Sequence, residues 1–411
     1  MDASADEVMD IAREGHRAYE RGDYDEARRL FRIATDHGNI RAQCFLGVMY
    51  AEGRGVGRDY DKACCLYRLA ADQGDAPAQY NLGIMYEKGR GVEQDYAEAY
   101  KWYQKAADQG HAGAQNNLGF MYEEGRGMDQ SDAEACQWYQ LAADQGDAWG
   151  QSNLGRMYEE GLGVGRDYGK ALCLYRLAAG QGHAGAQCNL GRMYEEGLGV
   201  EKSDAEACRW YREAADQGYA WAQCNLGDMY RTGRGVDKSD AEARRWYQKA
   251  ADQGHAGAQC NLGRMYEEGL GVETDYDEAL RLYRLAAGQG DAGAQNNLGV
   301  MYAEGHGVER DYSEARRWYQ KAADQGDAGA QCNLGRMYAE GCGVGRDYGK
   351  ARHWYRLAAD RGDARAQCSL GSMYDFGRGV ERSATKARYW YGLAADQGNT
   401  HAQDALRQMR P

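Results

Sequence analysis

The feature that most constrains this chain is a 36-residue unit that recurs ten times, without insertion or deletion, from Asn39 to Gly398. A Leu-Gly dipeptide marks its register, with the leucine at Leu46, Leu82, Leu118, Leu154, Leu190, Leu226, Leu262, Leu298, Leu334 and Leu370. A fixed period of this length is typical of stacked repeat arrays, in which each unit packs on its neighbours. We therefore expect one elongated domain from the 411 residues.

The unit from Asp75 to Gly110 shows what each repeat encodes. Asp75 and Asp95 are good caps for two helix starts, and apolar residues follow each of them at the spacing of three and four that indicates an amphipathic helix. The sequence Gly-Arg-Gly-Val separates the two stretches, and its glycines allow a reversal that most residues cannot adopt. Each repeat is therefore predicted to be an antiparallel pair of helices.

The two ends of the chain depart from the period. The first unit has a connection of only Gly22-Asp23-Tyr24, between helices expected at about Ser4–Arg21 and Asp23–Asp36, and a final helix is expected at about Thr400–Met409. Terminal units of an array differ because one of their faces meets water. The predicted organisation is an N-terminal capping unit over 1–38, ten repeats over 39–398 and a C-terminal capping helix over 399–411.

Charge and hydropathy exclude several classes of partner. The net charge is −13 and no basic run occurs, which disfavours nucleic acid and anionic membranes, since both require clustered Lys and Arg. No apolar stretch approaches the roughly 20 residues of a membrane span. The start, MDASADEVMD, lacks the basic and then apolar layout of a signal peptide. We expect a cytoplasmic protein without nucleic-acid or membrane partners.

The twelve cysteines follow the repeat. Six share one column, at Cys44, Cys188, Cys224, Cys260, Cys332 and Cys368. Equivalent positions in successive units are separated by at least the ~8–10 Å between packed helices, beyond the roughly 7 Å that a disulfide can span between Cα atoms. The cysteines are therefore interpreted as small, reduced packing residues.

Motifs for catalysis and cofactor binding are absent from the sequence. It contains no His-Glu-x-x-His zinc motif and no Gly-x-Ser-x-Gly nucleophile motif. The stretch 164–171 superficially resembles a phosphate loop, but it starts with Val164 instead of glycine and has Ala171 after its lysine. We expect no enzymatic activity, no cofactor and no metal site.

The consensus A-x-A-Q-x-N-L-G-x-M-Y-x-x-G-x-G-V-x-x-D-Y-x-x-A-x-x-W-Y-x-x-A-A-D-Q-G resembles the Sel1-like repeat family, longer-looped relatives of tetratricopeptide repeats. The match covers 39–398, and the first unit resembles a tetratricopeptide repeat more closely. The resemblance implies an all-α fold, a right-handed α-solenoid (superhelix) of stacked antiparallel helix pairs with its concave face lined by first helices. It also implies an adaptor that assembles complexes. A disulfide-stapled branch of the family is not supported, because the second helices end without cysteine.

Partner-binding residues are expected at exposed positions that vary between repeats. The groove of tetratricopeptide repeats uses the second, fifth, ninth, twelfth and thirteenth residues of the first helix, and the resemblance carries this pattern over. The residues predicted to bind a partner on the concave face are Val48, Tyr80, Ile84, Phe120, Trp149, Arg156, Arg192, Trp221, Asp228, Arg264 and Arg336.

These residues form two candidate patches. An apolar N-terminal patch around Phe120 would supply aromatic anchors, with partial burial against the preceding unit as the alternative. An arginine column beginning at Arg156 would capture carboxylates, with intrahelical pairing to Glu159 and Glu160 as the alternative. Asp228 interrupts the column, in the most divergent repeat.

The predicted function is a non-enzymatic scaffold or adaptor that binds peptide or helical segments of protein partners along the concave face. Each similar repeat would add a small contact, so that affinity would depend on length and avidity. Two alternatives stay open, a structural or self-associating array and a regulatory subunit of a separate enzyme. The sequence leaves the oligomeric state open.

Overall fold

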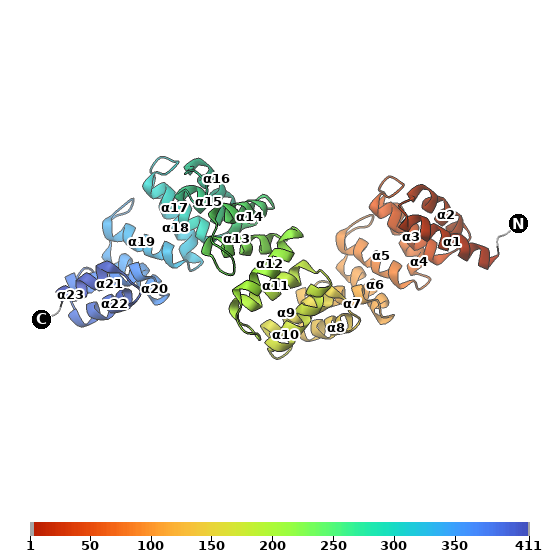
Figure 1. The fold of residues 1–411 in the computed structure, drawn as a ribbon, viewed down its shortest axis with the longest axis horizontal. Helices are drawn as coiled ribbons and strands as arrows, with labels where there is room; N and C mark the ends of the chain where they lie inside the picture. The colour runs from red at the N-terminus through yellow and green to blue at the C-terminus, as the bar shows by residue number, and fades with distance from the viewer. Residues whose placement is uncertain (1–3, 410–411) are drawn as a thin grey trace. The chain divides into compact units, whose positions relative to one another are not determined.

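A computed structural model describes residues 4–409, so that residues 1–3 and 410–411 of the two predicted caps lie outside the described part. Within that part the chain forms 23 α-helices and no strand (Figure 1). The predicted all-α class is therefore confirmed. The helices are α1 Ala5–Glu20, α2 Tyr24–Asp36, α3 Ile40–Glu52, α4 Tyr60–Ala71, α5 Ala76–Lys88, α6 Tyr96–Asp108, α7 Ala112–Glu124, α8 Asp132–Asp144, α9 Ala148–Glu160, α10 Tyr168–Gly180, α11 Ala184–Glu196, α12 Asp204–Asp216, α13 Ala220–Thr232, α14 Asp240–Asp252, α15 Ala256–Glu268, α16 Tyr276–Gly288, α17 Ala292–Glu304, α18 Tyr312–Asp324, α19 Ala328–Glu340, α20 Tyr348–Asp360, α21 Ala364–Phe376, α22 Ala384–Asp396 and α23 Thr400–Gln408.

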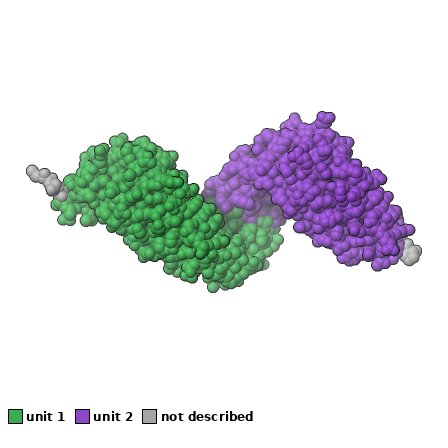
Figure 2. Space-filling model, turned by 180° about the vertical axis from the view of Figure 1, so that it is seen from behind, with its two compact units in different colours: residues 1–210 green, residues 211–411 purple. Residues whose placement is uncertain are grey.

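The chain is divided into two compact units, unit 1 (Met1–Trp210) and unit 2 (Tyr211–Pro411), coloured separately in Figure 2. Inside each unit the helices pair in chain order, such as α1 with α2 and α13 with α14. A first helix also contacts the first helix of the next repeat, as α1 contacts α3 and α19 contacts α21. Stacked antiparallel helix pairs, as predicted, therefore build each unit.

The capping residues act as the sequence predicts. The Asp75 carboxylate accepts a hydrogen bond of 2.8 Å from the Ala78 amide at the start of α5. Gly89 ends that helix with φ of 62°, in the left-handed region that favours glycine. Asp95 accepts from the Ala97 and Glu98 amides at the start of α6. A capping side chain at a fixed place in the period therefore begins each of these two helices.

The core of each repeat is an aromatic ring packed on glycine. Tyr139 in α8 is fully buried, and its ring lies so close to α7 that a Cβ added to Gly119 would be 2.6 Å from it. Leu118 and Met121 complete the buried face of α7. The anchor glycine is therefore a point of close helix contact, as the Leu-Gly register implies.

A buried glutamine links each repeat to the one before it. In the third repeat, the Gln115 side chain donates to the Ala107 carbonyl of α6 at 3.2 Å and accepts from Gln145 after α8 at 2.6 Å. The same pair of contacts recurs at Gln79 and Gln259. The consensus contains this glutamine, but its role emerges only when successive repeats are stacked.

All twelve cysteines are free, and seven of them are buried. This agrees with their interpretation as reduced packing residues.

In residues 4–409, no helix is both long and apolar enough to cross a membrane.

Candidate functional site

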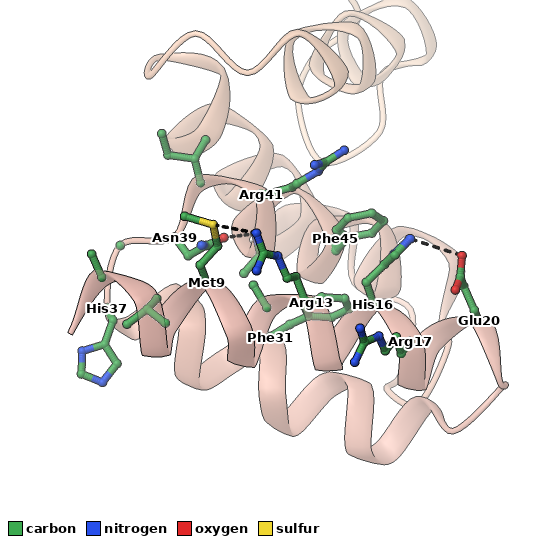
Figure 3. A pocket seen from close by; sticks show the side chains of 16 residues that line it. Met9, Arg13, His16, Arg17, Glu20, Phe31, His37, Asn39, Arg41 and Phe45 are labelled. Carbon is green, nitrogen blue, oxygen red and sulfur yellow. Dashed lines mark hydrogen bonds and ion pairs between the residues drawn. The ribbon is translucent and has the colours of Figure 1, made fainter. Parts of the chain in front are cut away.

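A groove with a volume of about 990 Å³ opens between α1 and α3 in unit 1 (Figure 3). Its floor is formed by Phe31 and Phe45, whose rings stack with centroids 5.3 Å apart and an interplanar angle of 7°. Val8 lies at its edge, and Met9, 45 % exposed, stands on the α1 side. Phe31 is fully buried, so that the apolar surface that solvent reaches comes from half-buried Phe45 and from Met9.

The departure of the first repeats from the consensus creates this floor. Phe45 occupies the column in which the next eight repeats have asparagine, and Phe31 occupies the column in which later repeats have tyrosine. Gly15 gives Phe31 the same close contact that Gly119 gives Tyr139, since a Cβ on Gly15 would lie 2.9 Å from the Phe31 ring. The first unit thus keeps the packing of a repeat, and the first regular repeat has an apolar ring, Phe45, where the next eight have a polar amide.

The rim of the groove is positively charged, with exposed Arg13, Arg17 and Arg41 around the apolar floor (Figure 3). Arg13 forms an ion pair with Asp10 at 3.1 Å, on the exposed surface. His16 lies 3.3 Å from Glu20, the one acidic residue of the lining. In a chain of net charge −13, this basic rim is a local reversal of sign that attracts carboxylates.

The apolar patch predicted from the sequence is only partly accessible. Val48, Tyr80 and Ile84 are half-buried and pack against the cores of neighbouring helices. The Tyr80 ring stacks on His111 with centroids 4.6 Å apart. Phe120 is 36 % exposed, and the Arg126 guanidinium lies 4.9 Å from the centre of its ring. Of these four residues, Phe120 offers the most accessible ring.

Two predicted tryptophans stand on the surface, one in each unit. Trp149 of unit 1 is 62 % exposed and Trp221 of unit 2 is 61 % exposed. Each indole stands almost perpendicular to a histidine that caps the next first helix, with centroids 4.4 Å apart, His183 for Trp149 and His255 for Trp221. The histidines support the indoles from one side and leave the rest of each ring exposed.

The first two arginines of the predicted column pair mainly with the preceding repeat. Arg156 lies 2.6 Å from Glu123, and its intrahelical partner Glu160 is farther away, at 3.6 Å. Glu123 also accepts from the Tyr139 hydroxyl at 2.9 Å. Burial, and then the negative charge of Glu123, raises the pKa of Tyr139. This Tyr-Glu-Arg bridge joins two repeats, a role that neither the groove prediction nor the intrahelical alternative anticipates.

The same bridge recurs one repeat later. Arg192 lies 2.6 Å from Glu159 and 3.9 Å from the intrahelical Glu196, and Glu159 accepts from Tyr175 at 2.9 Å. In both repeats the glutamate precedes its arginine by 33 residues. That spacing is the sequence signal by which the bridge could have been found.

The remaining three predicted residues, all in unit 2, differ from one another. Asp228 accepts from the Tyr247 hydroxyl at 2.7 Å and lies 3.5 Å from Arg231. Arg264 is half-buried and donates to the Asn261 side chain at 3.3 Å. Arg336 is exposed. The arginines of the column therefore differ in their contacts and in their exposure.

The groove itself was missed by sequence reasoning. None of its lining residues is among the predicted ones, although Arg41 is the second residue of the first helix in the first regular repeat and so occupies a groove position of the tetratricopeptide pattern. The sequence signal that could have revealed the groove is Phe45, at a repeat position where the next eight repeats have asparagine.

Comparison with known proteins places the whole array in context. A family model described as Sel1 repeat matches residues 13–39, 40–75, 76–111, 112–147, 150–183, 184–219, 222–255, 256–291, 292–327, 328–363 and 364–399. The model thus also matches the first unit, which resembled a tetratricopeptide repeat by its short turn. No curated protein matches the chain.

Two solved structures are similar at the level of sequence as well as fold. One is a protective antigen of uropathogenic Escherichia coli strains that displays an SLR fold, with 36 % identity, a TM-score of 0.77 and coverage of 98 % of this chain and 87 % of that one. The other is a Sel1 repeat protein from Oxalobacter formigenes, with 33 % identity, a TM-score of 0.55 and coverage of 59 % of this chain and 96 % of that one.

Proposed function

Since this chain belongs to the Sel1 repeat family, we propose that it is a non-enzymatic interaction scaffold whose N-terminal groove binds an acidic segment of a partner protein. Repeat solenoids of this kind commonly serve protein–protein interaction. The observation that carries the proposal is the groove between α1 and α3, with its apolar floor and basic rim.

The chemistry of the groove defines the segment. Half-buried Phe45, which stacks on the buried Phe31 ring, and exposed Met9 offer a surface for one or two apolar side chains. Arg17 and Arg41 are exposed at the rim and would pair with carboxylates on either side of the apolar residues. A short helix or strand with apolar anchors flanked by Asp or Glu fits both properties.

The residues predicted from the sequence remain proposed contact points. Phe120 and Trp149 in unit 1, and Trp221 in unit 2, are exposed aromatic side chains on first helices. Each would extend the contact beyond the groove and add to affinity through several weak contacts.

We propose a cytoplasmic location, supported by twelve free cysteines, because disulfides are rare in that reducing compartment. The similar E. coli protein is a protective antigen, which favours the opposing view of a chain exported from the cytosol. Cell fractionation with an antibody against the native chain decides between the two.

Site-specific photo-crosslinking tests the function. A benzophenone side chain at Met9 faces the groove, whereas the same group at Arg32, exposed on α2 outside the groove, is the matched control. We expect adducts with acidic partner segments from Met9 only, and their loss in the triple variant Arg13→Glu, Arg17→Glu, Arg41→Glu.

Adducts that form equally from Arg32, or that survive the charge reversal, would contradict the proposal. Adducts between copies of this chain would favour the self-associating array. Adducts with one enzyme would favour a regulatory subunit.

A further inference from the structure

A second cavity, in unit 2, lies where the Tyr-Glu-Arg bridge is incomplete. In register with Glu123, Tyr139 and Arg156, this part of the chain has Ala303, Tyr319 and Arg336. The tyrosine and the arginine are present, but alanine replaces the glutamate between them. All three residues line a cavity of about 440 Å³ bounded by α17, α18 and α19.

Neither Tyr319 nor Arg336 has a carboxylate partner among residues 4–409. Tyr319 is 1 % exposed, and no carboxylate among residues 4–409 accepts a hydrogen bond from its buried hydroxyl, whereas the Tyr139 hydroxyl donates to Glu123. Arg336 is exposed, whereas Arg156 is held at 2.6 Å from a carboxylate. A buried polar group without a partner destabilises the folded chain.

The other repeats with alanine at this position avoid the mismatch. Ala51 is followed in register by Ile84, and Ala339 is followed by Ser372. Among the repeats with alanine here, Ala303 alone is followed by an arginine; Arg231, which also replaces the glutamate, precedes Arg264, but there Asp228 accepts from the repeat's tyrosine.

The two acidic residues of the lining contact side chains other than Arg336. Glu304 lies 3.7 Å from the His306 ring, and Glu340 contacts the Cys342 thiol at 3.8 Å. The Arg310 side chain donates to the Glu304 carbonyl at 3.3 Å. Neither arginine of the lining is at ion-pair distance from a carboxylate among the described residues; Arg310 is held by that carbonyl, and Arg336 is exposed.

We propose that this cavity binds a carboxylate group of a ligand, which takes the place of the missing glutamate between Tyr319 and Arg336. The carboxylate accepts from the guanidinium and, once it is seated, from the Tyr319 hydroxyl. The source is either an acidic side chain of a protein or a small free carboxylate. This site is independent of the N-terminal groove.

Fluorine NMR of trifluoroacetate added to the intact protein tests the site. We expect broadening of the trifluoroacetate line with the native chain and no broadening with Arg336→Gln. We also expect none with Ala303→Glu, because the new carboxylate would occupy the place between Tyr319 and Arg336. Arg192→Gln, an arginine of the same column that already has Glu159, should keep the broadening. Broadening that persists in both Arg336→Gln and Ala303→Glu would overturn the proposal.

A second measurement remains informative if Arg336→Gln fails to fold. Ala303→Glu should raise the thermal midpoint above that of the native chain, because it completes the bridge, and Ala303→Gln should raise it less. An unchanged or lower midpoint in Ala303→Glu would overturn the proposal. Competition by the peptide acetyl-Gly-Glu-Gly-amide would identify a protein side chain as the source, whereas competition by propionate alone would identify a small carboxylate.

Discussion

At the scale of single residues, one position of the repeat has different chemistry according to its neighbours. Arg156 and Arg336 occupy equivalent positions, yet the first completes a bridge with Glu123 and the second faces Ala303. A residue in such an array therefore acquires its role from the residue 33 positions earlier, more than from its own helix.

Three capping histidines make the stability of the chain dependent on pH. At His111, His183 and His255, Nδ1 accepts a helix amide at 3.0–3.2 Å, which requires the neutral ring. Burial lowers the pKa of each histidine. Because the unfolded histidine titrates near 6.5, the unfolded chain takes up protons that the folded chain does not. Stability is therefore fully present above about pH 6.5 and is lost as the pH falls below it.

Replacing all three histidines with asparagine tests this dependence, since Asn39 and Asn399 cap helices in the same chain. We expect the variant to lose less unfolding free energy than the native chain between about pH 7.5 and 5.5. Chemical denaturation at both pH values gives the comparison. Equal losses in the two proteins would contradict the assignment.

At the scale of helices, the repeat depends on close contact between its two members. Gly119→Ala in α7 would place a methyl group 2.6 Å from the Tyr139 ring, and we expect a loss of about 1–3 kcal/mol, as for other overpacked cores. Gly180→Ala at the end of α10 is the control, because no atom lies within 4 Å of its added Cβ. Urea unfolding followed by circular dichroism should separate them, and similar stabilities would contradict the packing role.

The helices and their order could be predicted from the sequence because their signals are local. Capping residues such as Asp75, loop glycines such as Gly89 and the apolar spacing all act within one repeat. The bridge between Arg156 and Glu123 could not be recognised so easily, because its partners are distant in sequence and adjacent only after stacking. Intrahelical Glu160 offered the more obvious partner, but it lies farther away.

At the scale of the whole molecule, regular repeats build the scaffold, and departures from them create the sites. The N-terminal groove exists because Phe31 and Phe45 replace the usual tyrosine and asparagine, and the second cavity exists because Ala303 replaces a glutamate. The sequence prediction chose other residues of the regular repeats, and it did not consider the first unit, which lines the groove together with Arg41 and Phe45 of the first regular repeat.

Hydrogen exchange of the intact chain, alone and with the partner recovered through Met9, tests the central claim most directly. We predict added protection of backbone amides in residues 5–20 and 40–52, the helices that border the groove, larger than any change in residues 211–411. Protection that leaves α1 and α3 unchanged and falls elsewhere would contradict the claim that the N-terminal groove binds the partner.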